Sequence, residues 1–233
     1  NNGRARSADF EVNDAYAMQV LKAAKPMVLK PEQLANEQGK VYSIAYAPTE
    51  AIEGDFLNGI SRDAFRIAHE ISSYSYPALA KGARPMMQGR KASLLALSYL
   101  GAERTMPNYN TMGLAKASLE AATRYLAFSL GPEGIRVNTI APETTETEQV
   151  KPSLYIKPEL QQNVARWTPL GRFGEPRDMA GCAVFLATEL SSWVTGTTVH
   201  ADGGALAAAG FYRTPSGAWT NTPIVTGDGF GFS

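Results

Sequence analysis

The sequence predicts an α/β fold built on a doubly wound parallel sheet, in which helices cover both faces. Apolar runs of strand length lie at residues 41–48, 91–100, 135–142 and 196–204, and helices long enough to cross a sheet separate them. Strands that alternate with such helices pair in parallel with their neighbours. Because 44% of the 233 residues are hydrophobic and 19% are charged, the chain can bury an ordinary globular core. We therefore predict a single domain over residues 1–233.

The first 40 residues are polar and mixed, and they predict a short, atypical opening to this fold. Residues 14–24 have the pattern of a helix with Asn13 as its N-cap. Residues 26–30 are compatible with a short strand, and residues 31–39 with a short helix that ends at a glycine. The predicted N-terminal part, residues 1–40, thus holds one strand and two helices.

The next elements have clearer patterns. VYSIAYAP (41–48) is an apolar run stopped by proline, which is typical of a buried strand. Residues 61–87 are predicted to be largely helical, with Ser61 as the cap. One side of this helix carries four residues at helical spacing: Phe65, Ala68, Ile71 and Ser72. Residues 91–100 include six apolar residues and predict a central parallel strand.

The C-terminal half continues the alternation of helices and strands. A long amphipathic helix ends at the stop signal Gly131–Pro132, and a buried strand follows at 135–142. A further helix is predicted over 175–190 and a last strand with its turn over 196–204. Residues 210–233 are rich in Gly, Thr and Pro, and predict an extended tail.

The charge balance and the few cysteines and histidines limit the possible functions. With 22 basic and 22 acidic residues the net charge is zero, so we expect neither nucleic acid nor a membrane surface as a partner. No apolar run approaches the roughly 20 residues that span a bilayer, and the N-terminus lacks the apolar core of a secretory signal. Cys182 is the only cysteine and lies in an apolar context that predicts core packing. His69 and His200 have no cysteine partners, so we expect no metal site. Because a single cysteine cannot form an intrachain disulfide, we expect a reducing, cytoplasmic location.

Tyr109 and Lys116 form the pair that points to chemistry. Seven steps of about 100° place both on nearly the same face of a helix, two turns apart. An ammonium near a phenol favours the phenolate, so we expect a lowered tyrosine pKa and a group able to donate a proton near neutral pH. Tyr99 ends the preceding strand and faces the same cleft, because ligands bind at the carboxyl ends of parallel strands. Its neighbour Ser98 should then point away from the cleft.

The sequence around this pair resembles one family closely. The resemblance is carried by LSYLGAERTMPNYNTMGLAKASLEAATRYLAFSLGPEGIRVNTI (97–140), and by SIAYAP, EGDFLNGISRDAFRIAHEISSYSY and ALAKGARPMM before it. These segments are similar to the bacterial enoyl-(acyl-carrier-protein) reductases, a divergent branch of the short-chain dehydrogenases. Their signature is Tyr-x-x-Met-x-x-x-Lys, matched here by Tyr109, Met112 and Lys116. The resemblance implies a Rossmann-like form of the predicted sheet. The segment PLGRFGEPRDMAGCAVFLATELSSWVTGTTVHADGGALA looks more like the ordinary short-chain dehydrogenases.

The resemblance implies an oxidoreductase that reduces the carbon–carbon double bond of an enoyl thioester in fatty acid biosynthesis. NADH is the implied cofactor, with NADPH as the other possibility, and the implied partners are acyl carrier protein and three further copies in a homotetramer. The implied catalytic residues are Tyr99, Tyr109 and Lys116, and the implied substrate contacts are Ala47 and Tyr99. The implied cofactor contacts are Ser43, Ile44, Lys116, Thr145, Glu146, Thr147, Glu148 and Gln149.

The sequence departs from that family at the place where the cofactor's pyrophosphate should bind. Such proteins open with a glycine-rich turn between a strand and a helix, yet Gly3 and Gly39 are the only glycines before residue 41. Ala45 and Glu143 also stand where the family has glycines, and a carboxylate near a pyrophosphate opposes its binding. Three explanations remain open: lost cofactor binding, an incomplete sequence, or an unusual N-terminal arrangement.

Two alternative functions therefore stay beside the leading one. The ordinary-type C-terminal half is compatible with a carbonyl reductase or alcohol dehydrogenase. The absent glycine-rich loop is compatible with a non-catalytic member of the family.

Overall fold

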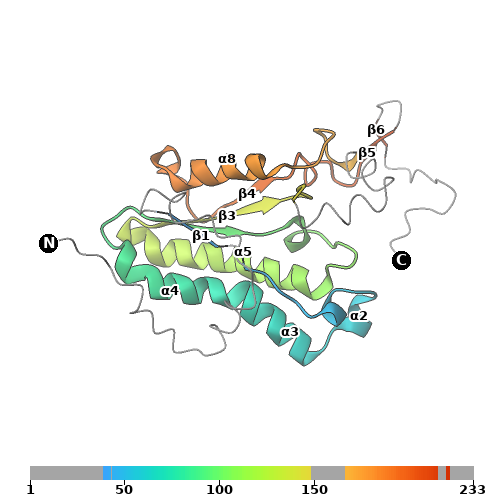
Figure 1. Ribbon diagram of the computed structural model, residues 1–233, viewed down its shortest axis with the longest axis horizontal. Coiled ribbons are helices and arrows are strands. Elements are labelled where there is room, and N and C mark those ends of the chain that lie inside the picture. Colours follow the sequence, from blue (N-terminus) through green and yellow to red (C-terminus); the bar gives the residue numbers. More distant parts are fainter. Residues whose placement is uncertain (1–38, 43, 148–165, 215–218, 221–233) are drawn as a thin grey trace.

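The computed structural model describes residues 39–42, 44–147, 166–214 and 219–220. The helices and the strand predicted over residues 14–39 lie outside this part. Four strands form one parallel sheet in the order β1-β2-β3-β4 (Figure 1). Their bounds are β1 Gly39–Tyr42, β2 Ser93–Leu97, β3 Arg136–Pro142 and β4 Thr198–Ala201.

Helices cover both faces of the sheet, which confirms the doubly wound fold (Figure 1). One face is covered by α4 Ser75–Met87 and α5 Asn110–Leu130, and α3 Arg62–His69 packs against α5. The short helix α2 Phe56–Gly59 precedes α3 and lies beyond the ends of the strands (Figure 1). The opposite face is covered by α8 Pro176–Ala187, which contacts all four strands. A π-helical turn, η3 Glu70–Tyr74, joins α3 to α4. Short 3-10 turns lie at η2 Thr49–Ala51, η4 Leu100–Ala102, η5 Gly131–Glu133 and η6 Glu189–Ser191.

Helix ends follow the predicted signals with small shifts. The Ser61 hydroxyl accepts a hydrogen bond from the Ala64 amide and caps α3, as predicted. The long helix α5 ends at Leu130, and the chain then makes a 3-10 turn before Gly134 takes a left-handed φ of 73°. At α8 the side chain of Glu175 and that of Asp178 cap each other's backbone amides.

The strand predicted over 41–48 is shorter than expected. It ends at Tyr42, and the Tyr46 side chain is 53% exposed. Ser72 provides the physical reason, because its hydroxyl accepts a hydrogen bond from the Tyr46 amide and donates one to the Tyr46 carbonyl. The backbone polar groups that a neighbouring strand would satisfy are satisfied here by a helix side chain.

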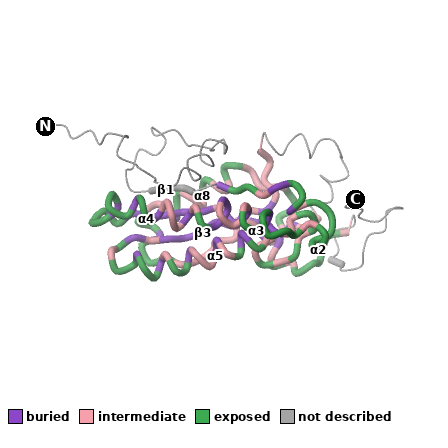
Figure 2. The backbone as a smooth tube through the Cα atoms, turned by 90° about the horizontal axis from the view of Figure 1, so that it is seen from below, coloured by how far each residue is buried: buried purple, intermediate pink, exposed green. Residues whose placement is uncertain are grey.

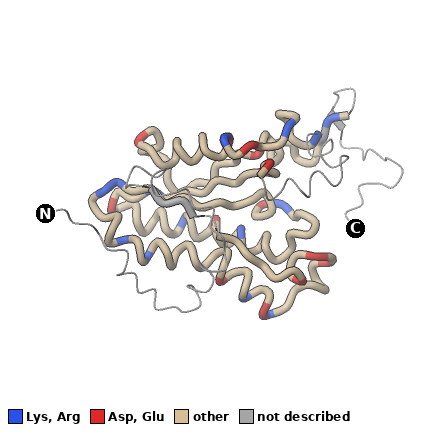
Figure 3. The backbone as a smooth tube through the Cα atoms, in the orientation of Figure 1, with Lys and Arg blue, Asp and Glu red and all other residues tan. Residues whose placement is uncertain are grey.

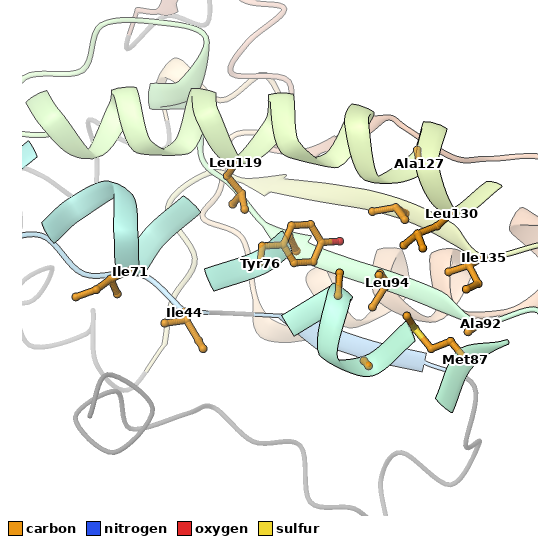
Figure 4. Close-up of a cluster of buried hydrophobic side chains, with 14 residues drawn as sticks. Ile44, Ile71, Tyr76, Met87, Ala92, Leu94, Leu119, Ala127, Leu130 and Ile135 are labelled. Carbon is orange, nitrogen blue, oxygen red and sulfur yellow. The ribbon is translucent and has the colours of Figure 1, made fainter. Parts of the chain in front are cut away.

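Successive residues of β2 point into two different cores. Leu94 joins the cluster between the sheet and helices α4 and α5, where Tyr76, Leu119 and Ile135 are almost fully buried (Figure 4). Leu95 points the other way and packs with Ile140 and Leu186 beneath α8. This alternation is the geometry of a strand that is buried on both faces. Figure 2 shows the buried residues concentrated along β3 and on the inner sides of the helices.

Two details of the predicted packing need correction. Phe65 is 39% exposed, and the neighbouring Ala64 takes the buried position at the start of α3. Cys182 packs against the cluster beneath α8 as predicted, but it is only half-buried.

The predicted C-terminal tail includes a small antiparallel ribbon, formed by β5 Tyr212–Arg213 and β6 Trp219–Thr220. Acidic and basic residues are interspersed over the described helices and loops (Figure 3). No helix in the described part of the chain is long and apolar enough to cross a membrane.

Candidate active site

The site lies where β2 and β3 end. Both strands are parallel, so their carboxyl ends meet at one edge of the sheet. The Ser98 amide donates a hydrogen bond to the Ile140 carbonyl at 2.7 Å, which keeps the two strands paired up to the point where they diverge. Tyr99 follows β2 and Glu143 follows β3. Their side chains therefore converge over this edge.

Tyr99 and Tyr109 form an edge-to-face ring pair with centroids 4.7 Å apart. Tyr109 is the N-cap residue of α5 and lies just before the helix rather than inside it. Gly101 allows the close approach of the turn after β2 to this ring. A Cβ atom at Gly101 would lie 2.4 Å from Cδ1 of Tyr109 and 2.7 Å from Cε1. Gly113 allows the same turn to approach α5, because its Cβ would meet the Gly101 carbonyl oxygen at 2.7 Å.

Ala47 and Tyr109 share one apolar cluster, since both pack against Ala68, Met112 and Ala115. The structure thus brings together the predicted substrate contact Ala47 and the predicted proton donor. Ile44 is 9% exposed and belongs to the main core. Ser43 lies outside the described residues.

Lys116 is buried on the sheet side of α5. Its Nζ donates a hydrogen bond to the Leu97 carbonyl at 2.8 Å, near the end of β2. Burial lowers the pKa of Lys116 to about 8, and the nearby Glu120 carboxylate opposes part of this shift. The side chain is therefore a cation near neutral pH with two further hydrogens available for a ligand.

The predicted lowering of the Tyr109 pKa is wrong for this structure. Burial raises the pKa of Tyr109 because a phenolate would be poorly solvated there. The Lys116 ammonium donates its hydrogen bond to the Leu97 carbonyl, and burial is what sets the direction of the Tyr109 pKa. Tyr109 is therefore a neutral phenol over the whole physiological pH range. Among the described residues no hydrogen bond is recorded for its hydroxyl.

Glu143 has an unusually confined carboxyl group. The side chain is buried, and its Oε1 accepts hydrogen bonds from the Thr144 amide at 2.9 Å, the Thr144 hydroxyl at 3.0 Å and the Tyr99 hydroxyl at 3.2 Å. Oε2 is buried and has no hydrogen-bond partner among the described residues. Burial raises the pKa of Glu143, and the negative charge of Asp202 adds to the effect. The sequence indicated an unfavourable charge here, but it did not indicate the contact with Tyr99.

The loop after β3 holds the remaining predicted cofactor contacts. The Thr145 hydroxyl donates to the Glu143 carbonyl, and the Glu146 amide donates to the Gly174 carbonyl at 2.8 Å. Thr147 is described and half-buried, whereas Glu148 and Gln149 lie outside the described residues. The loop is thus anchored to the segment before α8.

Ser98 is buried, lines neither of the two cavities described below, and donates a hydrogen bond to the Glu120 carboxylate of α5. His200 pairs through Nε2 with Glu103 at 2.9 Å. In the described part of the chain no three His, Cys, Asp or Glu side chains are grouped so that they could hold a metal ion.

One cavity adjoins Glu143 and another adjoins Tyr109. One, of about 490 Å³, lies beside Glu143 between the ends of β3 and β4 and the start of α8, with Pro169, Phe173 and Met179 in its walls. The other, of about 320 Å³, lies beside Tyr109 and includes Gly101 and Gly113 in its lining. Gly101, Gly113 and Glu120 were not singled out from the sequence, because their roles depend on which segments approach each other in the fold.

Comparison with known proteins places this geometry in context. The sequence model of the family described as enoyl-(acyl carrier protein) reductase matches residues 32–205. The NADH-dependent enoyl-(acyl-carrier-protein) reductase of Neisseria meningitidis is 51% identical over 166 residues, which is 71% of this chain and 63% of that protein. The corresponding Escherichia coli enzyme is 47% identical over 171 residues, or 73% of this chain and 64% of that protein.

Solved structures of enoyl-(acyl-carrier-protein) reductases are also similar to this chain. The crystal structure of the NADH-dependent enoyl-(acyl-carrier-protein) reductase of Aquifex aeolicus has a TM-score of 0.66 at 37% identity, and the match covers 72% of this chain and 65% of that one. The Bacillus cereus reductase, solved with NADP+ and indole naphthyridinone, has a TM-score of 0.64 at 37% identity, with 72% and 64% covered. This chain spans less than two thirds of the length of these proteins.

Proposed function

Because this chain belongs to the enoyl-(acyl-carrier-protein) reductase family, we propose that it reduces the carbon–carbon double bond of an enoyl thioester with NAD(P)H in fatty acid biosynthesis. The observation that carries the proposal is the arrangement of three groups at the end of β2. Within the described residues no hydrogen bond engages the Tyr109 hydroxyl, Tyr99 packs against its ring, and the Lys116 ammonium donates to the Leu97 carbonyl at the end of β2.

In the proposed reaction Tyr109 donates a hydrogen bond to the thioester oxygen. Reduction at the β-carbon moves electrons toward that oxygen, and an enolate develops there. A neutral phenol stabilises this charge and supplies a proton to it. Burial keeps Tyr109 protonated at neutral pH, as this role requires. Ala47 and Tyr99 would contact the substrate beside it, because Ala47 shares the apolar cluster of Tyr109 and Tyr99 packs against the Tyr109 ring.

The cofactor in this proposal is NADH, which supplies the hydride when bound. NADH-dependent relatives support this choice, and the Bacillus cereus structure with NADP+ keeps NADPH open. Lys116 would bind ribose hydroxyls with the hydrogens that Leu97 leaves available. Ile44 and Thr145 to Thr147 would contact the nicotinamide half, together with Ser43, Glu148 and Gln149.

The described residues include groups that could bind the nicotinamide and its ribose, but none that matches the family's pyrophosphate-binding turn. No glycine-rich turn between a strand and a helix is present in the described ranges, which begin at Gly39 with the strand β1. The family's pyrophosphate cradle therefore has no counterpart there. For this reason the proposal assigns residues to the nicotinamide and its ribose alone.

The proposed partners are acyl carrier protein, as the bearer of the substrate, and further copies of the chain in a cytoplasmic homotetramer. Exposed aromatic residues support the assembly: Tyr125 and Phe128 on α5 are 77% and 85% exposed, and Trp193 after α8 is 98% exposed. Apolar surface of this kind is typical of interfaces. Sedimentation equilibrium should give four times the 25.1 kDa of the chain, and a monomer would contradict the assembly.

The activity is tested by mixing the purified chain with NADH or NADPH and a crotonyl thioester, and by following the absorbance of the reduced cofactor. Tyr109→Phe should lower kcat by at least about 100-fold, the usual value of a positioned acid. No turnover by a folded, tetrameric protein would refute the proposal. Reduction of a 3-oxoacyl thioester instead would favour a carbonyl reductase. No heat of binding with either cofactor in a calorimeter would favour a non-catalytic member.

A further inference from the structure

The two tyrosines of the site differ in what their hydroxyl hydrogens do. The Tyr99 hydroxyl donates to Glu143 Oε1 at 3.2 Å. For the Tyr109 hydroxyl no hydrogen bond is recorded within the described ranges. Since a phenol has only one hydrogen to donate, Tyr99 offers a ligand only its lone pairs as long as the contact with Glu143 holds.

The hydrogen bond between Tyr99 and Glu143 is supported by further hydrogen bonds to the same carboxyl group. Oε1 of Glu143 accepts three hydrogen bonds, two of them from the amide and hydroxyl of the adjacent Thr144. These local bonds fix the carboxyl orientation without any help from Tyr99. Among the described residues Oε2 accepts no hydrogen bond, so a proton on that oxygen would break none of these contacts. Oε1 stays an acceptor for Tyr99 in both ionisation states.

We propose that Glu143 is a positioning residue that withholds the Tyr99 hydrogen from the substrate, so that Tyr109 alone donates to the thioester oxygen. This inference rests on the proposed function for the identity of the substrate. The captured hydrogen, by which we mean the Tyr99 hydroxyl hydrogen that is bonded to Glu143, is a property of the chain itself. Glu143 would thereby determine how many hydrogen bonds the pocket donates to the substrate carbonyl, and so how strongly that carbonyl is polarised. A side chain without an acceptor at position 143 would release a second donor into the pocket.

The first experiment reads the hydroxyl of Tyr99 without any substrate. Protein labelled with 13C at the tyrosine Cζ reports phenol hydrogen bonding through the chemical shift of that carbon, and Tyr99→Phe identifies the resonance. Glu143→Ala should move the Tyr99 signal. Glu143→Gln should leave it near the wild-type position, because the amide oxygen still accepts from Tyr99. Glu53→Ala, which removes an exposed carboxylate, is the matched control and should not move it.

The second experiment measures kcat/KM with NADH and a crotonyl thioester. Glu143→Ala should raise it by about three- to tenfold, the worth of one additional neutral hydrogen bond. Glu143→Gln should gain less than Glu143→Ala. Tyr99→Phe should cost more in the Glu143→Ala background than in the wild type, because only there does Tyr99 donate to the substrate.

The outcomes separate the two proposals. An unmoved Tyr99 signal in folded Glu143→Ala would overturn the captured hydrogen. A lower kcat/KM in Glu143→Ala, or an equal cost of Tyr99→Phe in both backgrounds, would overturn the withholding from substrate. A moved signal without crotonyl reduction by any variant would leave the captured hydrogen standing and refute the proposed function instead.

Discussion

Gly101→Ala is predicted to disable the site by displacing the Tyr109 ring. The new methyl carbon would lie 2.4 Å from Cδ1 of Tyr109, whereas ordinary carbon contacts begin near 3.4 Å. The ring must therefore move by about 1 Å. It cannot do so freely, because Tyr99 packs on it and the cluster of Ala68, Met112 and Ala115 lies beneath it.

The expected loss follows from that displacement. A 1 Å misplacement of a reacting group costs on the order of 100-fold in rate, so kcat for crotonyl thioester reduction should fall about 100-fold. Overpacking should also lower the free energy of unfolding by about 1–3 kcal/mol. The rate is measured by cofactor absorbance, and the stability by urea unfolding followed by circular dichroism.

Gly181→Ala provides the matched control. Gly181 lies within α8, and a Cβ there meets no atom within 4 Å. This variant should keep the wild-type kcat. Its free energy of unfolding should rise by about 0.5–1 kcal/mol, because alanine has less conformational entropy than glycine in the unfolded chain. A Gly101→Ala protein whose kcat stays within about threefold of the wild type would refute the reasoning, since the 100-fold loss rests on a fixed ring.

Three further predictions concern stability, each measured by urea unfolding. Burial lowers the pKa of Lys116 to about 8 from 10.5, so the folded state binds fewer protons than the unfolded chain between these pH values, and stability from this group rises across that range. Lys116→Met should therefore be more stable than wild type at pH 7, by roughly 3 kcal/mol, and the difference should shrink toward pH 10; an equal difference at both pH values would contradict this. Arg136→Met should cost about 2–3 kcal/mol, because the guanidinium donates to the Leu186 and Thr188 carbonyls and ties β3 to the end of α8; a cost below 0.5 kcal/mol would count against it. Ser61→Ala should cost about 1 kcal/mol through loss of the α3 cap, and Ser61→Asp should restore it.

The order of elements could be predicted from the sequence because each strand and helix carries its own signal. The apolar run at 91–100 and the Gly131–Pro132 stop are local features, and β2 and the end of α5 lie where these features indicate. The strand at 41–48 was predicted too long for a physical reason. Its later residues pair with Ser72, a helix residue 26 positions away from Tyr46, and no local pattern reports such a bond.

The site could be predicted only as a set of residues. Spacing alone placed Tyr109 and Lys116 on one side of a helix, and that helix does carry Lys116 on its buried face. The direction of the Tyr109 pKa depends on burial and on where the Lys116 ammonium points, and neither is a property of spacing. The same holds for Glu143, whose contact with Tyr99 joins the ends of two strands 44 positions apart.

The π-helical turn η3 keeps the buried residues of α3 and α4 on the same side of the helical region. Ala64 and Met87 are both buried, yet 23 steps of about 100° would carry Met87 roughly 140° round a straight α-helix from Ala64. The wider turn at Glu70–Tyr74 advances the chain by less rotation per residue, so α3 and α4 present one continuous buried stripe. Removal of a single residue here would let a regular α-helix continue from α3 into α4, because 22 steps of about 100° leave Met87 only about 40° from Ala64. The turn is thus the point at which this helical region holds one additional residue while α3 and α4 both keep their buried sides against the core.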